Sequence, residues 1–341
     1  MVGKCFPVLV LILLPFLSSC GPIPDYRGFA SGDVTPPVFV DITPVSPSSL
    51  RIAFDGPVRV SEGGLSLKPD LGTVSVSADG STVLVEHETE QEAGMKYCLQ
   101  GVVQDEKGNA MSFITDFYGF NPRIPSLIIN EFTTQGSSTH PDMVEFAVQS
   151  DGNTAGMVFF QGVKEEHDAL YLFPPLEVRS GDFVILHCKP QGIAAEVDES
   201  DSKAASGGYD ASADAWDLWF SGGKGLSGNN GVISLYENPG GKVLDAVLYS
   251  NRTSESDTDY GGFGSTAVLL QAQRLAELSA WEYTAASIRP EDAVNPTGST
   301  ATRSLCRGSD RADTNSSSDW HIVPTSCFSF GSNNSDEVYE P

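Results

Sequence analysis

Short runs of alternating apolar and polar residues, separated by turn residues, are the feature that most limits the folds open to this 341-residue chain. Five such runs follow one another early in the chain, at 38–42, 49–54, 73–77, 82–86 and 96–100. A period of two places alternate side chains on opposite faces of a strand, so each run has one apolar face that needs a core. Strands at this spacing, with no helical pattern between them, predict a β-sandwich.

The same alternation continues in a second part of the chain. Four further runs lie at 127–132, 142–146, 176–186 and 231–247. Between the two parts, residues 121–125 read Asn-Pro-Arg-Ile-Pro, and the two prolines restrict this segment to extended geometry. We therefore expect an all-β protein with two tandem sandwich domains, at residues 36–121 and 126–334.

Two segments of the second domain depart from the strand pattern. Residues 265–281 hold apolar side chains at helical spacing without Gly or Pro, which predicts one inserted helix that covers the sandwich. Residues 335–341 are polar and are expected to form a flexible tail. The tight turn Ala78-Asp79-Gly80-Ser81, in the first domain, predicts a hairpin.

The order of motifs in the first domain resembles a bacterial Ig-like domain. The motifs are Thr35-Pro36-Pro37, Phe54-Asp55-Gly56-Pro57-Val58, the Ala-Asp-Gly hairpin, Gly94 to Tyr97, and the turn from Asp105 to Asn109. The resemblance implies an Ig-like sandwich that serves as a spacer or an adhesive module.

The second domain resembles a lamin tail domain. Its landmarks are the Ile129-Asn130-Glu131 opening, the strands at 142–146 and 181–186, and a hairpin at 235–246. Met143 stands where the family usually has Trp, and Asn238 replaces a turn Asp. The resemblance implies a second Ig-like sandwich. Lamin tail domains often accompany nucleases or phosphatases in exported bacterial chains, so an accessory or metal-dependent hydrolase is the alternative function.

The N-terminus has the pattern of a targeting segment. Lys4 precedes an apolar run from Phe6 to Leu17, which is too short to span a membrane and long enough for a signal peptide. Leu17-Ser18-Ser19-Cys20 resembles the bacterial lipobox. The resemblance implies a signal peptide at 1–19, acyl chains on Cys20, a tether at 20–35, and a lipid-anchored place in the bacterial cell envelope. An ordinary secretory signal with a chance cysteine is the alternative.

Charge and cysteine content limit the partners. The formal net charge is −25 and no Lys/Arg block offsets it, so nucleic acid is not expected as a partner. Four cysteines follow Cys20, and their spacing matches no zinc site. In an exported protein a Cys306–Cys327 disulfide is possible, and four free thiols are the alternative.

No catalytic, metal or cofactor motif is recognisable. The five histidines, His87, His140, His167, His187 and His321, are scattered singly. The Gly-rich stretch 221–228 lacks the Gly-Lys-Ser/Thr ending of a phosphate-binding loop, and no helix is expected to follow it. Two acidic groups are weak calcium candidates, for which solvated loops are the simpler interpretation: Asp198-Glu199-Ser200-Asp201, and Asp210 with Asp214 and Asp217.

A cluster of aromatic residues in the long polar segment 190–230 is the best candidate for recognition. Trp216, Trp219, Phe220 and Tyr209 supply contact area at low entropic cost, although Leu218 and Phe220 also fit the start of a buried strand. We expect a non-enzymatic binding, adhesion or scaffolding protein with a protein or polysaccharide ligand. A purely structural spacer is the remaining alternative, and the sequence does not indicate an oligomeric state.

Overall fold

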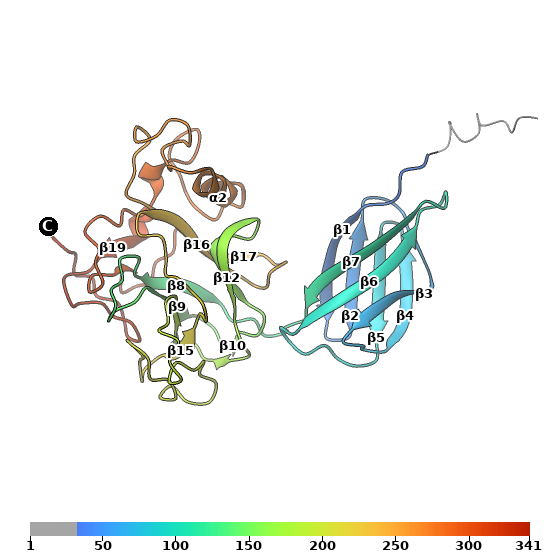
Figure 1. The fold of residues 1–341 in the computed structure, drawn as a ribbon, viewed down its shortest axis with the longest axis horizontal. Helices are drawn as coiled ribbons and strands as arrows, with labels where there is room; N and C mark the ends of the chain where they lie inside the picture. Colours follow the sequence, from blue (N-terminus) through green and yellow to red (C-terminus); the bar gives the residue numbers. More distant parts are fainter. Residues whose placement is uncertain (1–32) are drawn as a thin grey trace, which may run out of the picture.

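The computed structural model describes residues 33–341 (Figure 1). The expected signal peptide, Cys20 and most of the tether lie outside the described residues. The described part folds into five β-sheets, one α-helix and two short 3₁₀ helices, η1 (Pro290–Asp292) and η2 (Ser317–Asp319). No helix in this part is both long and apolar enough to cross a membrane. The all-β prediction is confirmed.

The first unit is an antiparallel sandwich of seven strands (Figure 1). The strands are β1 (Phe39–Ser46), β2 (Ser49–Phe54), β3 (Arg59–Lys68), β4 (Thr73–Asp79), β5 (Thr82–His87), β6 (Lys96–Gln104) and β7 (Ala110–Tyr118). One sheet has the order β1-β2-β5-β4 and the other β3-β6-β7. Leu50, Ile52, Val83, Val85 and Leu99 are fully buried in the core of this unit.

All five strand runs predicted for this unit are strands, and the predicted hairpin is present. Asp79 pairs with Thr82, and Gly80 takes the positive φ of 56° that this turn requires. The sequence did not reveal β3 and β7. Gly63 and Gly64 interrupt the apolar pattern of β3, and the exposed Ile114 blurs the alternation of β7.

The second unit is built on a six-stranded and a four-stranded sheet. The strands are β8 (Leu127–Phe132), β9 (Met143–Val148), β10 (Gly152–Asn153), β11 (Val158–Val163), β12 (Glu166–Leu172), β13 (Glu177–Val178), β14 (Phe183–His187), β15 (Trp216–Trp219), β16 (Asn230–Tyr236), β17 (Val243–Ser250), β18 (Leu305–Arg307) and β19 (Trp320–Ile322). The six-stranded sheet has the order β15-β14-β9-β8-β18-β19 and the four-stranded sheet β12-β11-β16-β17. Strands β10 and β13 form a separate pair.

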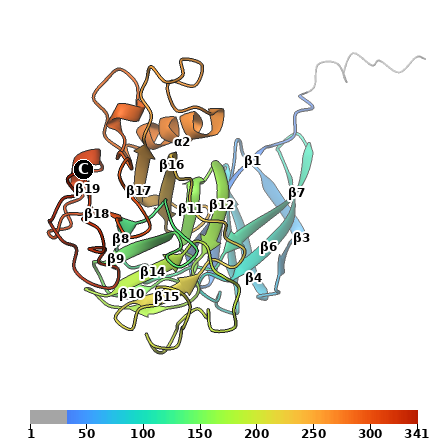
Figure 2. The same ribbon diagram turned by 60° about the vertical axis from the view of Figure 1, so that its left-hand side comes forward.

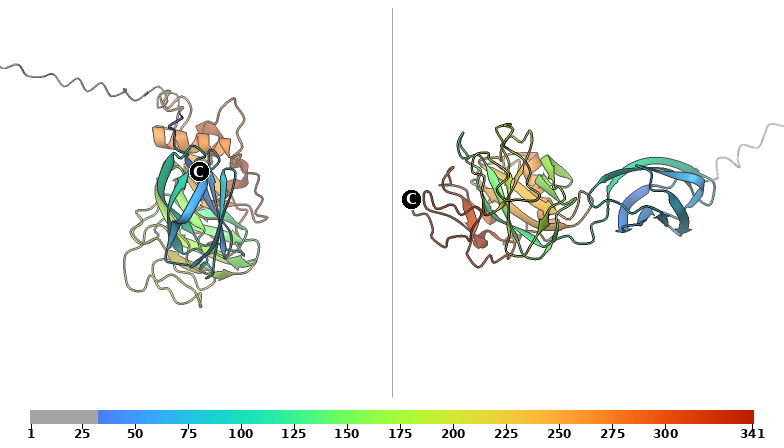
Figure 3. Two further views of the ribbon diagram at one scale, coloured as in Figure 1. Left: turned by 90° about the vertical axis from the view of Figure 1, so that its right-hand side faces the viewer. Right: turned by 90° about the horizontal axis from the view of Figure 1, so that it is seen from below.

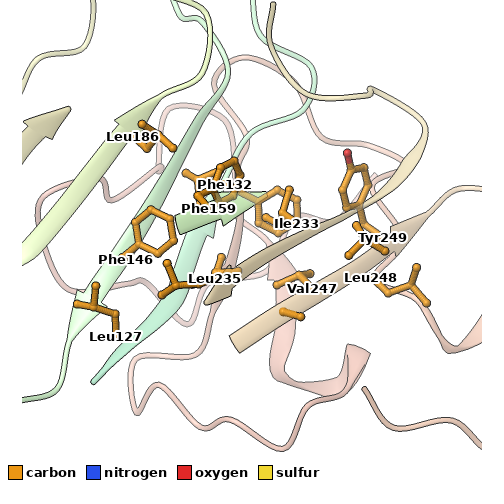
Figure 4. Packing of buried hydrophobic residues seen from close by; sticks show 14 of the residues in the cluster. Leu127, Phe132, Phe146, Phe159, Leu186, Ile233, Leu235, Val247, Leu248 and Tyr249 are labelled. Carbon is orange, nitrogen blue, oxygen red and sulfur yellow. The ribbon is translucent and has the colours of Figure 1, made fainter. Parts of the chain in front are cut away.

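Large apolar side chains from both sheets meet in the core of the second unit (Figure 4). Phe132 and Phe146 come from the six-stranded sheet, and Phe159, Ile233 and Val247 from the four-stranded sheet; all five are fully buried. Burying a side chain of this size stabilises the fold by about 1.5–3 kcal/mol. The alternation seen in the sequence therefore gives two inward faces that bury each other.

Helix α2 (Thr266–Glu277) confirms the predicted inserted helix and lies over the four-stranded sheet (Figure 2). The side chain of its N-cap residue, Ser265, accepts a hydrogen bond from the backbone N–H of Val268. Its inward face contains Gln271, Ala272 and Leu275, and the helix contacts β11, β12 and β16. Gln271 thus places a polar amide on a helix face that otherwise buries apolar side chains against the sheet.

One predicted strand run differs from the structure. The run at 176–186 is divided into β13 and β14, because a turn closes where the Arg179 N–H donates to Asp182 and Gly181 has a φ of 94°. The expected flexible tail, residues 335–341, is mostly exposed, and its flexibility remains a prediction. The Asn334 amide, 5% exposed, donates to the Arg307 carbonyl, and the Tyr339 N–H donates to Ile322.

The two units lie end to end, with residues 121–125 between them (Figure 3). The Asn121 amide donates to the carbonyls of Asn153 and Ala155, so the linker is attached to the second unit. Gly94 and Gly156 approach so closely that a Cβ on Gly94 would lie 2.3 Å from the Gly156 nitrogen. The independence of the two units remains a prediction.

Candidate functional site

A cavity of about 300 Å³ lies between helix α2 and the four-stranded sheet. We call it the Tyr249 cavity. The polar side chains that define it are Gln161 from β11, Asp168 from β12, Tyr249 from β17, Arg252 just after β17, and Gln271 from α2. Val232, Ile233 and Phe263 supply apolar wall. Its volume is at the lower end of the range of small-molecule sites.

The hydroxyl of Tyr249 is placed by the strand opposite. Tyr249 pairs with Gly231 of β16, and a Cβ on Gly231 would lie 2.8 Å from the tyrosine oxygen. Figure 4 shows this hydroxyl pointing away from Val247 and the rest of the core. Burial raises the pKa of Tyr249 well above its usual range, and the carboxylate of Asp142 raises it further. At physiological pH the cavity therefore presents a neutral hydroxyl.

Two amides line the same cavity. The Nε2 of Gln161 is buried and has no hydrogen-bond partner among the described residues. Gln271, 3% exposed, lies next to it with its Nε2 against Gly162, where a Cβ would come within 2.9 Å. A buried amide without a partner costs about 1–3 kcal/mol. The Gln161 amide is therefore an unsatisfied donor in the wall of the cavity.

Two opposite charges also line the cavity. The guanidinium of Arg252 lies on Gly264, where a Cβ would come within 2.3 Å of its Cζ atom. Asp168 is exposed on β12. Within residues 33–341, neither side chain takes part in a salt bridge. Both charges are therefore free to contact a ligand.

The beginning of α2 completes the lining. Gly264, Ser265, Ala267 and Val268 border the cavity, and the first turn of the helix contains no acidic residue. The first N–H groups of a helix have no partner within the helix, and they carry the positive end of its dipole. This end of the cavity therefore favours a negatively charged group, on the same element that places Gln271.

The expected Cys306–Cys327 disulfide is absent, because all four cysteines of the described residues are free. Cys306 is buried in β18 with its sulfur 3.5 Å from His321 Nε2. The Cys327 thiol instead turns toward the carbonyl of Thr325. The two thiols face different partners. Their positions in the same C-terminal region therefore do not place them within bonding distance of each other. Cys20, the expected lipid site, lies outside the described residues.

The acidic calcium candidates are engaged separately. Asp198 accepts from the Tyr171 hydroxyl and the Trp219 N–H, Asp210 contacts His140 at 2.9 Å, and Asp217 contacts the buried His187 at 2.8 Å. Asp201 accepts from Ser200. Within residues 33–341, no three metal-ligating side chains gather into one group. The structure thus gives these aspartates hydrogen-bonding roles.

The aromatic candidates belong mainly to the core. Trp219, 5% exposed, is in strand β15 and stacks on His187 with ring centroids 3.7 Å apart. Trp216 and Phe220 pack against the main core, and only Tyr209 is exposed. The buried-strand alternative is confirmed, since β15 pairs in parallel with β14.

A buried ionic network, which the sequence did not reveal, attaches the C-terminal segment to the second sandwich. Arg307 is fully buried, and its Nη2 lies 3.2 Å from the carboxylate of Asp245. Burial raises the pKa of Asp245 to about 7, although Arg307 opposes the shift. Glu145, also buried, has its pKa raised by burial and by the neighbouring Glu131. These residues are fully enclosed, so they cannot reach a ligand.

Residues 125–322 match the family model described as the TP_1001 protein second domain, which covers more than half of the chain. The chain belongs to this family. A relative in Treponema pallidum (strain Nichols), described as an uncharacterized protein, is 30% identical over 159 residues. The matched part is 46% of this chain and 40% of the relative, so this chain spans well under two thirds of the relative's length.

Among solved structures, the chain is similar to the crystal structure of dimeric latent PorU from Porphyromonas gingivalis. The match has 14% sequence identity and a TM-score of 0.20, and it covers 67% of this chain and 20% of PorU. So low a score supports no statement about fold or function.

Proposed function

We propose that this protein is a lipid-anchored protein of the bacterial cell envelope that binds a small polar molecule in the Tyr249 cavity without transforming it. The observation that carries the proposal is the make-up of the cavity. A neutral hydroxyl, an unsatisfied amide and two unpaired charges surround a space of about 300 Å³. Neither His nor Cys is among the residues that line it. Groups of this kind orient a ligand.

The rest of the chain would serve to present this site. We propose that the first unit is an Ig-like spacer and that the second is a lamin-tail-like sandwich. Acyl chains on Cys20 would hold both to the membrane, since the sequence there resembles a lipobox. The motif orders described above and the two β-sandwiches support this arrangement.

The anchor is tested with the full-length chain in a bacterium that processes lipoproteins. The wild-type protein should incorporate labelled palmitate and partition into detergent, and Cys20→Ser should lose both properties. A Cys98→Ser variant is the matched control and should keep them. Label that persists in Cys20→Ser would place the anchor elsewhere.

Binding is tested by thermal shift and equilibrium dialysis of the full-length protein with a panel of amino acids, monosaccharides and small carboxylic acids. At least one class should bind saturably, and no class should be consumed. Failure of every class, or turnover of nuclease or phosphatase substrates with added divalent metal, would refute the proposal and favour the spacer or the hydrolase.

A further inference from the structure

We propose that the ligand of the Tyr249 cavity is a free α-amino acid. This inference rests on the proposed function and specifies its ligand class. Arg252 and the first turn of α2 would hold the α-carboxylate, and Asp168 would hold the α-ammonium group. The Tyr249 hydroxyl would bond to a carboxylate oxygen, the acceptor that such a molecule offers.

The proposed site for the carboxylate of the ligand is inferred from two independent features of the cavity lining. The guanidinium of Arg252 lies flat against Gly264, which leaves its donors without an acidic partner among the described residues. A planar guanidinium matches a carboxylate through two parallel hydrogen bonds. The N-terminus of α2 adds the positive end of the helix dipole on the same side, with the Val268 N–H already bonded to Ser265. Both features select a negatively charged group.

The proposed site for the ammonium group of the ligand is inferred from an irregularity in strand β12. Gln161 pairs with Ala169, and Gly162 pairs with His167, so Asp168 is the extra residue of a bulge. Bulges redirect a side chain out of the regular alternation of a strand. This bulge places Asp168 among the cavity residues, beside Gln161. A carboxylate at that position selects a cationic group.

A zwitterion suits the whole protein better than an ion of either sign. The chain has a formal charge of −25, which repels anions at long range, and one guanidinium offsets little of it. A ligand without net charge avoids this repulsion and still uses both local charges. Val232, Ile233 and Phe263 leave apolar wall for a side chain, and about 300 Å³ limits the ligand to a single small molecule.

Calorimetry on the full-length protein tests the proposal with alanine, leucine and glutamate as probes. Acetate and ethylamine each keep one of the two charges, and glucose tests a neutral polyhydroxylated ligand. We expect saturable binding of an amino acid, with affinity for acetate and ethylamine at least tenfold weaker. Arg252→Gln and Asp168→Asn should each weaken amino-acid binding at least tenfold.

Matched controls are available on exposed surface. Arg179→Gln and Asp259→Asn change the same residue types away from the cavity and should leave binding unchanged. Asp168 is exposed, so its variant should keep the parent melting temperature and remain informative even where Arg252→Gln loses stability.

Glucose or acetate binding as tightly as every amino acid would overturn the ligand class and leave the proposed function intact. Amino-acid binding that both cavity variants leave unchanged would overturn the site. Absence of binding by all six probes would also overturn the inference, and saturable binding of another ligand from the wider panel would then still support the proposed function.

Discussion

Replacing Arg307 with Met should show how strongly the buried ionic network stabilises the second sandwich. The Arg307 side chain is fully buried, and it donates from Nε to the Ile129 carbonyl at 2.7 Å and from Nη1 to the Ala312 carbonyl at 2.9 Å. Its Nη2 contacts the carboxylate of Asp245. Methionine fills a similar volume but leaves Asp245 without its cation. Breaking a buried pair from one side costs about 3–5 kcal/mol.

The loss should depend on pH, and the sign follows from Asp245. Its folded-state pKa of about 7 is above its unfolded value, so folding favours the protonated carboxyl. The contribution of this group to stability is greatest below about pH 4 and falls as the pH rises toward 7. Without Arg307 the folded pKa rises further, because the opposing positive charge is gone. The variant should therefore lose more stability at pH 8 than at pH 5.

Urea unfolding at pH 5 and pH 8, followed by tryptophan fluorescence, measures both effects. Trp320 reports on the site directly, because the guanidinium lies 4.8 Å from its ring centroid. Adding Asp245→Asn to Arg307→Met should recover a substantial part of the loss at pH 8, since no uncompensated charge then remains at position 245. A loss below about 1 kcal/mol, or one of equal size at both pH values, would refute the reasoning.

Three further outcomes are expected. Ser265→Ala should lower the free energy of unfolding by about 1 kcal/mol in urea melts, because the Val268 N–H loses its cap; Ser287→Ala is the exposed control. Glu145→Gln should stabilise the protein at pH 8 relative to pH 4 in the same assay, since burial and Glu131 raise the pKa of this acid; an unchanged pH profile would contradict this. Fragments 36–121 and 126–341 should each melt cooperatively by circular dichroism, and two unfolded fragments would disprove the domain boundary.

Much of the fold could be predicted from local pattern. The strands at 49–54 and 127–132 have the predicted bounds, and the helix begins where Ser265 caps it, because alternation and capping are properties of neighbouring residues. Strand β7 was missed because Ile114, an apolar residue, faces solvent. The run 176–186 was not predicted to divide, although its Ser180-Gly181-Asp182 segment is a local turn signal.

The candidate site could not be predicted in the same way. Gln161, Asp168, Tyr249 and Gln271 come from four separate elements, and none of them belongs to a recognisable motif. The one local signal was an amide at position 271 on the inward face of the helix. Arg307 and Asp245 are likewise 62 residues apart in the chain. Side chains that converge only through tertiary packing leave no pattern in a single sequence.

A crystal structure of the full-length protein grown with saturating alanine tests most directly whether the Tyr249 cavity is the binding site. The account predicts alanine in the cavity, with its carboxylate against Arg252 and its ammonium group against Asp168. Alanine bound at another place, or an empty cavity in crystals of a protein that binds alanine in solution, would contradict it.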